Sequence, residues 1–511
     1  PSPPRPARDL VVFADIIHAR VRAVNVGAAP TTFLGVTIAP GAVETVVGTG
    51  ERTSDPTAVT DGPAIQATLS FPSILAFDGR GLLWVSDSGN NLIRVANPTG
   101  AAVTLLGRTI APDALHTVVG TGEQGEPDDD GDGGPALDAK LAGPAAVLGA
   151  DGNLWILDGL QDLLDLIADL GGGPGPGAVD TEPRVRVLNL QAGPIVLAGV
   201  TIAPGELETV VGSAEERLPD GSNLGDGGPA LDATFLEPSG LSVRSDGLVF
   251  ISDSEDERIR VVNVTSSPLT IGGRTLAPGT IDTIVGAGVP GYSGDPAQVA
   301  AGYFGVSEAG LLDGPAGVVA LEDGRLVFTD ADNGAVRMAN LADSPRRFGG
   351  IEAAPGDLVV IAGSRSGRVR ARAPVDLEVD ASGATLFTDL GRFNVEPAVL
   401  RIDPTTRVVT RAVGTQERTA FDGSDLGDGG PALRATLAEP IGLDVDGDAL
   451  YIADAGNHRI RFVNRGASVV SPAPGLSVRP ADIDTIVDGS NDPDDTVPDD
   501  GQSIASPTSL T

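Results

Sequence analysis

The sequence contains no cysteine, only three histidines, and few aromatic residues, which make up 4% of the chain. Without cysteine the chain can form no disulfide, no thiolate metal site and no thiol nucleophile. It also lacks any apolar run of about 18 residues, the length that a membrane-spanning helix needs. The sequence therefore excludes a disulfide-stapled fold and predicts no membrane span.

Basic residues are scarce as well. The chain has 34 lysines and arginines against 70 aspartates and glutamates, a formal net charge of −36. Such a surface repels phosphate backbones, which argues against a nucleic-acid partner. The chain begins Pro1-Ser2-Pro3-Pro4, so that either a signal peptide has been removed or the sequence has been trimmed. We expect a secreted protein, either extracellular or at the cell surface.

Glycine and proline, in contrast, are abundant, with 69 and 40 residues. This content is too high for a helical protein, and no glycine recurs at every third position, so that collagen is excluded. Hydrophobic residues make up 41%, enough for a packed core. Turn-rich, all-β structure is what the composition predicts.

One segment, which we call the leader, recurs along the chain. Residues 131–139 read Gly-Asp-Gly-Gly-Pro-Ala-Leu-Asp-Ala, and this pattern returns at 225–233 and 427–435 and, shortened, at 61–64. After each leader comes Pro-x-Gly-Leu or a relative of it, then a short apolar stretch that ends in aspartate. Repeats of this kind indicate a stack of similar structural units.

In each unit we predict four strands: the Pro-x-Gly-Leu strand, the strand ending in Asp, a strand with Ile-Arg-x-Val, and a strand with Thr-Val-Val-Gly. Seven units can be counted by their strand-ending aspartates. A four-stranded sheet buries both faces only against neighbouring sheets, and radial stacking leaves only short edges. We therefore predict a single-domain, seven-bladed β-propeller over residues 1–511. Residues 505–511 are expected to supply the innermost strand of the blade that 10–48 begins.

An additional hairpin precedes the outermost strand in most units, as at residues 33–48. It is expected at the rim of the disk, on the face opposite the leaders. Because hairpin edges expose unpaired backbone groups, these edges could pair with another copy of the chain.

In five units an arginine follows the strand-ending aspartate at a spacing of seven residues. This spacing brings the two side chains together across a tight turn, and we interpret them as structural ion pairs; a ligand role for the ring of pairs is the alternative. The pairs are Asp15/Arg22, Asp87/Arg94, Asp253/Arg260, Asp330/Arg337 and Asp454/Arg461.

The segment Asp454-Ala455-Gly456-Asn457-His458-Arg459-Ile460, with a second good copy at 87–93, resembles the NHL repeat of bacterial secreted proteins. The resemblance implies a β-propeller and says little about function, because propellers serve as enzymes, scaffolds and binding modules. The family includes a metal-dependent lyase, and related propellers hydrolyse lactones. Zinc chemistry needs convergent ligands, and we do not expect His18, His116 and His458 to converge.

Calcium is the better metal candidate. Asp128, Asp130 and Asp132 place carboxylates at alternate positions in a glycine-containing segment, an arrangement that suits a hard cation. The twelfth position from Asp128 is alanine, so that the segment is not an EF-hand. Aspartate and glycine also favour turns on their own account, and a solvated turn is the alternative.

An insertion of about residues 159–183 interrupts the third unit. Leu163, Leu164, Ile167 and Leu170 fall at helical spacing within it. The expected helix either caps the central channel or offers an apolar stripe to a partner.

Together these features favour a non-catalytic extracellular binding or structural scaffold protein. Its partners are expected to be another protein or copies of itself, through hairpin edges or terminal strands. The alternative is a metal-dependent lyase or lactonase acting at the mouth of the channel.

Overall fold

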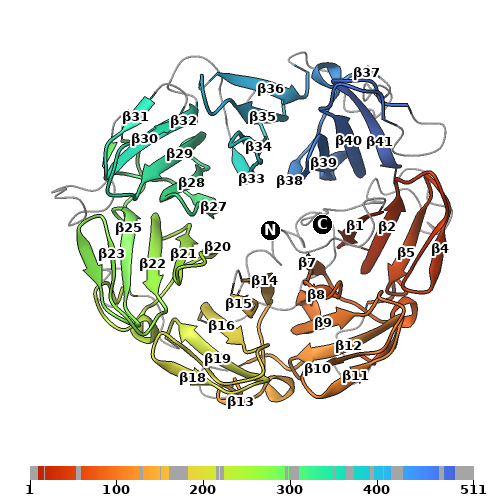
Figure 1. Cartoon of the computed structure of the whole chain (residues 1–511), viewed down its shortest axis with the longest axis horizontal. Coiled ribbons are helices and arrows are strands. Elements are labelled where there is room, and N and C mark those ends of the chain that lie inside the picture. The colour runs from red at the N-terminus through yellow and green to blue at the C-terminus, as the bar shows by residue number, and fades with distance from the viewer. Residues whose placement is uncertain are drawn as a thin grey trace.

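The computed structural model forms a disk of seven antiparallel sheets around a central axis (Figure 1), which confirms the predicted all-β propeller. No α-helix occurs in the part of the chain that it describes, and no helix there could span a membrane. The described residues are 10–16, 18–52, 59–125, 130–149, 151–159, 182–213, 218, 224–293, 297–298, 310–348, 351–363, 373–391, 396–406, 408–415, 428, 430–470 and 477–488.

The long strands of each blade follow one another outward from the axis. For blades 1 to 4 they are β1 (Leu10–Asp15), β2 (Arg20–Asn25) and β5 (Val43–Val47); β7 (Pro72–Phe77), β8 (Leu83–Asp87), β9 (Leu92–Ala96) and β12 (Ala114–Val119); β14 (Ala145–Leu148), β15 (Leu154–Asp158), β16 (Arg184–Leu188) and β19 (Glu206–Val211); β20 (Pro238–Val243), β21 (Leu248–Asp253), β22 (Arg258–Asn263) and β25 (Ile281–Gly286).

Blades 5 to 7 repeat this order. Their long strands are β27 (Pro315–Ala320), β28 (Arg325–Asp330), β29 (Ala335–Asn340) and β32 (Asp357–Gly363); β33 (Pro374–Val379), β34 (Thr385–Asp389), β35 (Ala398–Ile402) and β36 (Val409–Val413); β38 (Pro440–Asp446), β39 (Ala449–Asp454), β40 (Arg459–Asn464) and β41 (Asp482–Asp488).

Seven hydrophobic clusters fill the seven spaces between neighbouring blades. The second and third strands are nearly continuous runs of buried residues because they pack on both faces. Phe13 of blade 1 packs in one cluster with Tyr451 and Phe462 of blade 7. The ring is therefore closed by the same kind of contact that joins consecutive blades.

Blade 1 has three strands in the described residues, in the order β1-β2-β5. The predicted innermost strand at 505–511 lies outside the described residues and stays a prediction. The expected helical insertion, with Leu163, Leu164, Ile167 and Leu170, likewise lies outside them.

Five hairpins project between the third and fourth strands of blades 1 to 5. In these blades the third strand ends in asparagine or is followed directly by one. Its side chain holds the hairpin: Asn25 Nδ2 donates to Ala29 O at 2.8 Å and to Ile38 O at 2.9 Å. Blade 6 has Asp403 at this place and runs directly from β35 to β36. The hairpin strands are β3 (Thr31–Phe33), β4 (Val36–Ile38), β10 (Val103–Leu105), β11 (Arg108–Ile110), β17 (Ile195–Leu197), β18 (Val200–Ile202), β23 (Leu269–Ile271), β24 (Arg274–Leu276), β30 (Arg346–Phe348) and β31 (Ile351–Ala353).

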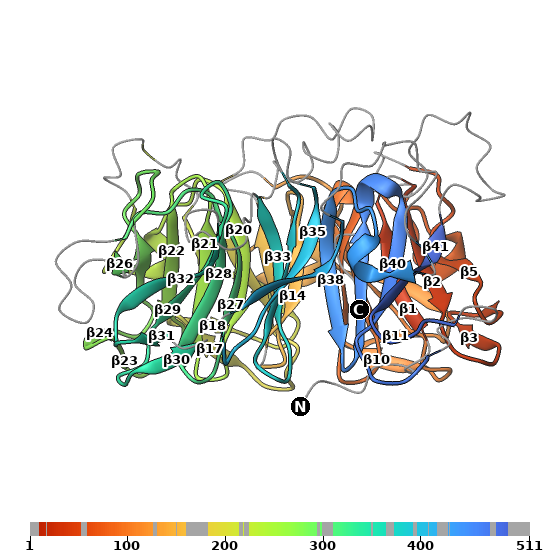
Figure 2. The same cartoon turned by 90° about the horizontal axis from the view of Figure 1, so that it is seen from above.

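These hairpins lie at one face of the disk, the lower one in Figure 2. The strand-ending aspartates lie at the opposite face, because the third strand runs from the aspartate end to the hairpin.

Several leaders run along the outer edge of a blade before the chain enters its innermost strand. In blade 2, β6 (Gly62–Pro63) pairs with β12, and in blade 3, β13 (Gly134–Pro135) pairs with β19. The same role falls to β26 (Ala297–Gln298) in blade 5 and β37 (Gly430–Pro431) in blade 7. The leader thus covers an edge that would otherwise offer unpaired backbone groups.

The Pro-x-Gly motif answers a steric need near the axis. A Cβ on Gly240 would lie 2.6 Å from the carbonyl oxygen of Ala316 on the next blade, and one on Gly317 would lie 2.8 Å from Val375 O. Glycine therefore permits the innermost strands of blades 4, 5 and 6 to approach one another closely.

Candidate functional site

The strand-ending aspartates are buried, and in blades 2 to 7 each anchors the start of the innermost strand of its own blade. Asp158 Oδ1 accepts the N–H of Ala142 at 2.7 Å, and Asp454 Oδ1 accepts that of Ala438 at the same distance. In blade 5, Asp330 Oδ1 accepts the N–H of Asp313 at 2.8 Å. The carboxylate thus joins the second strand to the chain entering the first.

Arginines meet most of these carboxylates. In four of the five predicted pairs a guanidinium nitrogen lies within 4 Å of a carboxylate oxygen. The contacts are Arg22 Nη1–Asp15 Oδ2 at 3.6 Å, Arg94 Nη1–Asp87 Oδ2 at 3.7 Å, Arg337 Nε–Asp330 Oδ2 at 2.5 Å and Arg461 Nη1–Asp454 Oδ2 at 3.1 Å. Arg260 of the fifth pair instead contacts Leu224 O at 3.0 Å and Asp226 Oδ1 at 2.8 Å.

A second carboxylate, the aspartate of the leader, belongs to this network and was not predicted from the sequence. It pairs with the same arginine: Asp132 with Arg186, Asp226 with Arg260 and Asp428 with Arg461, at 2.5, 2.8 and 2.7 Å. We call the strand-ending aspartate, the arginine and the leader aspartate together the hub of a blade. The signal for it was the fixed place of aspartate in the repeated Gly-Asp-Gly-Gly motif.

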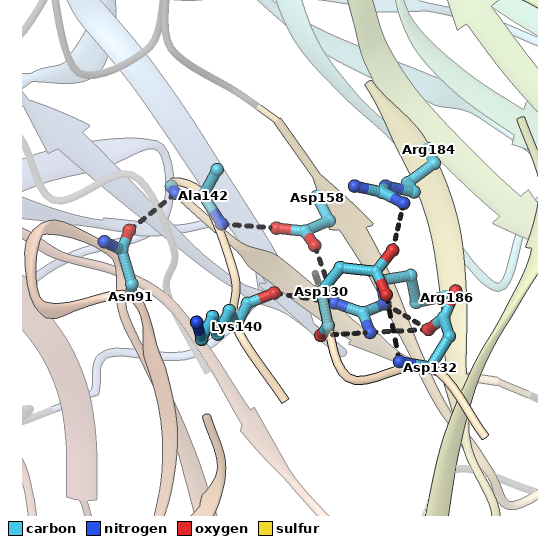
Figure 3. Close-up of polar contacts among 9 residues, drawn as sticks. Asn91, Asp130, Asp132, Lys140, Ala142, Asp158, Arg184 and Arg186 are labelled. Carbon is cyan, nitrogen blue, oxygen red and sulfur yellow. Dashed lines mark hydrogen bonds and ion pairs between the residues drawn. The ribbon is translucent and has the colours of Figure 1, made fainter. Parts of the chain in front are cut away.

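The hub of blade 3 is fully bonded (Figure 3). Arg186 Nη1 donates to Lys140 O at 2.9 Å and to Asp158 Oδ2 at 3.2 Å. Its Nη2 donates to Asp130 O at 3.1 Å, and both Nε and Nη2 donate to Asp132 Oδ1, at 3.0 and 2.5 Å. Although the insertion separates Asp158 and Arg186 in the sequence, the pair reaches the same geometry as elsewhere.

The carboxylates predicted to bind calcium lie in this hub. Asp132 pairs with Arg186, and the Asp130 carboxylate pairs with Arg184 (Figure 3). Asp128 lies outside the described residues. Within the described ranges, no group of three or more potential ligand side chains is placed to hold a metal ion. Two of the three predicted ligands therefore already face a guanidinium cation, and calcium binding stays a prediction.

The third residue after the strand-ending aspartate completes the turn. In three blades it is an asparagine whose Nδ2 donates to the aspartate: Asn90 to Asp87 at 2.9 Å, Asn333 to Asp330 at 3.0 Å and Asn457 to Asp454 at 2.9 Å. In blade 1 this place is taken by His18, and in blade 4 by Asp256.

The fourth residue after the aspartate is left-handed and reaches the next blade. Asn91, with φ of 55°, accepts the N–H of Gly143 through Oδ1 at 3.0 Å. Glu257, with φ of 52°, accepts the N–H of Gly314 through Oε2 at 2.8 Å. Because Glu257 is not a residue type that favours this conformation, its place is explained by the contact that it makes between blades.

Glu257 also lies in the most acidic part of this face. Burial, together with the charges of Asp313 and Asp330, raises the pKa of Glu257 to about 7, against the hydrogen bond from Gly314. Burial and the nearby Asp332 raise the pKa of Asp313. Exposed Glu255 belongs to the same turn as Glu257. A carboxyl group that titrates near neutral pH at the entrance to β27 is the main chemical candidate on this face.

The three histidines lie in different blades. His18 Nδ1 contacts Asp15 Oδ1 at 2.8 Å, and this hydrogen bond raises the pKa of His18. His116 is on β12, the outer long strand of blade 2, and its Nδ1 lies 3.3 Å from Asp61 Oδ2. His458 is the left-handed turn residue of blade 7.

No model of a known protein family matches the chain. Among solved structures, it is similar to virginiamycin B lyase from Staphylococcus aureus, with 12% identity, 87% of this chain and 90% of that one covered, and a TM-score of 0.39. It is similar to a chain of a nidogen/laminin complex, with 11% identity, coverage of 77% and 93%, and a TM-score of 0.35. It is also similar to a gluconolactonase from Xanthomonas campestris, with 12% identity, 74% of this chain and 78% of that one covered, and a TM-score of 0.35. At these levels the likeness carries no inference about activity.

Proposed function

We propose that this chain is a non-catalytic binding and scaffold protein of the NHL-repeat type that acts outside the cell. The observation that carries the proposal is the complete bonding of the hub of blade 3. At the strand ends of a propeller, where chemistry is often placed, the charged groups here bond to one another: Arg186 uses Nε, Nη1 and Nη2 on partners within blade 3. Such groups hold the face rigid and offer little for substrate.

A rigid face is suited to presenting loops, and the turn of blade 4 presents negative charge. Glu255 is exposed, Glu257 and Asp313 are partly exposed, and the chain as a whole has a net charge of −36. Two copies would repel each other through this acidic face. We therefore propose a basic protein surface as the partner of this face, and the hairpin face as the route for association with further copies.

The test is calorimetric titration of the protein with a poly-arginine peptide at low salt and at about 0.5 M salt, where screening of charges is nearly complete. We expect salt-sensitive binding that Glu255→Lys weakens several-fold. Glu44→Lys, an exposed position on β5 of blade 1, is the matched control and is expected to bind like the unaltered chain. Equal weakening by both variants would mean that net charge alone is responsible and would contradict the proposed face.

Association between copies is tested separately by light scattering over a wide concentration range, with and without calcium. The proposal expects assemblies larger than one chain at high concentration. A sharp monomer at every concentration would contradict the scaffold part of the proposal.

The second candidate function, a metal-dependent lyase or lactonase at the channel mouth, is favoured by one observation. The raised pKa of Glu257, about 7, suits a group that exchanges protons at neutral pH. Metal analysis of the purified protein, with assays on lactones and on precursors of amidated peptides, tests this candidate. Turnover that Glu257→Gln abolishes would establish it; absence of turnover with every added metal would reject it.

A further inference from the structure

The turn after β21 in blade 4 differs from its counterparts in one charge. Where Asn90, Asn333 and Asn457 donate a hydrogen bond to the strand-ending aspartate, blade 4 has Asp256. An ionised aspartate has no donor. The buried Asp253 of blade 4 therefore meets a carboxyl group where an amide is found in three other blades.

The hydrogen bonding of Asp253 reflects this change. Asp253 is 0% exposed, and its Oδ1 accepts the N–H groups of Leu236 and Glu237 at 3.1 and 2.9 Å. Its Oδ2 has no hydrogen-bond partner among the described residues, and neither have Nε and Nη1 of the equally buried Arg260. A buried acceptor without a donor is costly, so the structure requires something to satisfy Oδ2.

The positive and negative charges around this turn do not balance. The carboxylates come from Asp253 and Asp256 in the turn and from Asp226 in the leader. The guanidinium groups come from Arg258, which lies 2.8 Å from Asp256 Oδ1, and from Arg260, which pairs with Asp226. The three carboxylates outnumber the two guanidinium groups by one beside the fully buried Asp253, and one proton would balance the charges.

We propose that Asp253 and Asp256 hold one proton between them, and that this proton fastens blade 4 to blade 5. A protonated carboxyl group of Asp253 has an O–H at Oδ2 that can donate to the carboxylate of Asp256, so that a hydrogen bond joins the two residues as one joins aspartate and asparagine in the other blades. When the proton leaves for solvent, two adjacent buried carboxylates repel each other. The turn that they share then loses its fixed shape.

The turn carries the contact between the blades. Glu257 follows Asp256 directly and accepts the N–H of Gly314, the residue before β27. Asp313 and Asp330 face Glu257 from blade 5 and add to the negative charge. Loss of the proton therefore places repulsion on both sides of the contact between Glu257 and Gly314.

The titration of these groups agrees with this geometry. Burial and the charge of Asp256 together raise the pKa of Asp253 to about 6, against the opposing effects of the backbone hydrogen bonds and of Arg260. A carboxyl group whose pKa is raised by folding binds its proton more tightly in the folded state. Its contribution to stability is complete below pH 4 and is lost as the pH rises through about 6, so the protein is expected to be more stable at pH 5 than at pH 8.

The first test is Asp256→Asn, which gives blade 4 the turn of blade 7. We expect the melting temperature at pH 8 to rise by about 1–3 °C, with almost no change at pH 5. The matched variant is Asn457→Asp, which gives blade 7 the turn of blade 4. It is expected to lower the melting temperature at pH 8 and to leave it nearly unchanged at pH 5.

The second test is amide hydrogen exchange, corrected for the intrinsic effect of pH, in a peptide that covers Gly314 and the start of β27. We expect its protection to fall several-fold between pH 5 and pH 8 in the unaltered chain and to stay constant in Asp256→Asn. An Asp256→Asn variant with the unaltered pH profile, or one destabilised equally at both pH values, would overturn the proposal. Stabilisation at pH 8 by potassium chloride over the choline salt, absent in Asp256→Asn, would overturn it in favour of a bound cation.

Discussion

Blades 3 and 4 have the same leader, but the charged groups of their hubs are bonded differently. Residues 131–139 and 225–233 are identical in sequence, and in both blades the arginine pairs with the leader aspartate. In blade 3 the arginine also reaches Asp158, and all of its nitrogens have partners. In blade 4 Arg260 stays with the leader, and its Nε and Nη1 have no partner within the described residues.

The difference arises at the other end of the hub. Blade 3 brings a second arginine, Arg184, to its acidic leader, whereas blade 4 places an additional carboxylate, Asp256, beside Asp253. A repeated motif therefore determines the geometry of a hub, and the residues that face the motif determine whether its charges balance.

The largest expected effect comes from removing the central arginine of the balanced hub. Arg186→Met leaves the buried carboxylate of Asp158 and the partly exposed one of Asp132 without their cation, a loss of about 3–5 kcal/mol in the free energy of unfolding. Arg260→Met removes fewer bonds and is expected to cost about 2 kcal/mol. Urea denaturation of both variants at pH 7 measures the two losses. Equal losses would mean that the missing bonds of Arg260 are of no consequence.

The innermost strands of blades 3 and 4 differ in the size of one residue. Blade 4 has Gly240 where blade 3 has Ala146, and a Cβ at Gly240 would lie 2.6 Å from Ala316 O. We expect Gly240→Ala to cost about 1–3 kcal/mol through overpacking. Ala146→Gly, the control, should cost only about 0.5–1 kcal/mol through backbone entropy. Thermal unfolding of both measures the contrast, and an unaffected Gly240→Ala variant would show that the strands can separate without cost.

The leader aspartates predict a smaller difference. Asp132 accepts two bonds from Arg186, at 3.0 and 2.5 Å, whereas Asp226 accepts one from Arg260, at 2.8 Å. Asp132→Asn is therefore expected to cost about 1–2 kcal/mol, and Asp226→Asn about half of that. Urea denaturation of the pair is the measurement. A larger loss for Asp226→Asn would contradict the order that the bonding gives.

Calcium is expected to have the smallest effect. At Asp130 and Asp132 it must compete with Arg184 and Arg186, so that we expect weak binding and a rise in melting temperature below about 1 °C at millimolar calcium. Calorimetric titration after chelation measures the heat. Binding that Asp130→Asn does not weaken would place calcium elsewhere, and no heat at all would end the calcium interpretation.

The fold could be predicted because its signals are repeated and local. The strand-ending aspartates and the long buried runs recur with the blade, and the glycine of the innermost strand recurs in blades 4, 5 and 7. Each copy supports the interpretation of the others. The pairing of Asp454 with Arg461 follows from strand spacing alone. In contrast, Arg186 is separated from Asp158 by the insertion, and only the folded sheet brings them to 3.2 Å.

The hub was harder to predict, because its third member lies far away in sequence. Asp132 precedes Arg186 by 54 residues, a distance at which spacing gives no guide. The carboxylates of the leader indicated that a cation was needed, and the structure places the guanidinium groups of Arg184 and Arg186 beside them. That Asn90 and Asn457 act as donors, and that Asp256 takes their place in blade 4, could have been recognised by aligning the turns with one another.

The seven apolar clusters form a circle, and a circle has no terminal unit. An open row of repeats can unfold from its ends. Here the loss of one cluster exposes the faces of two blades at once and opens the ring. We expect heat to melt the described disk in one sharp transition, and a duplicated or deleted blade to alter the curvature at every remaining junction.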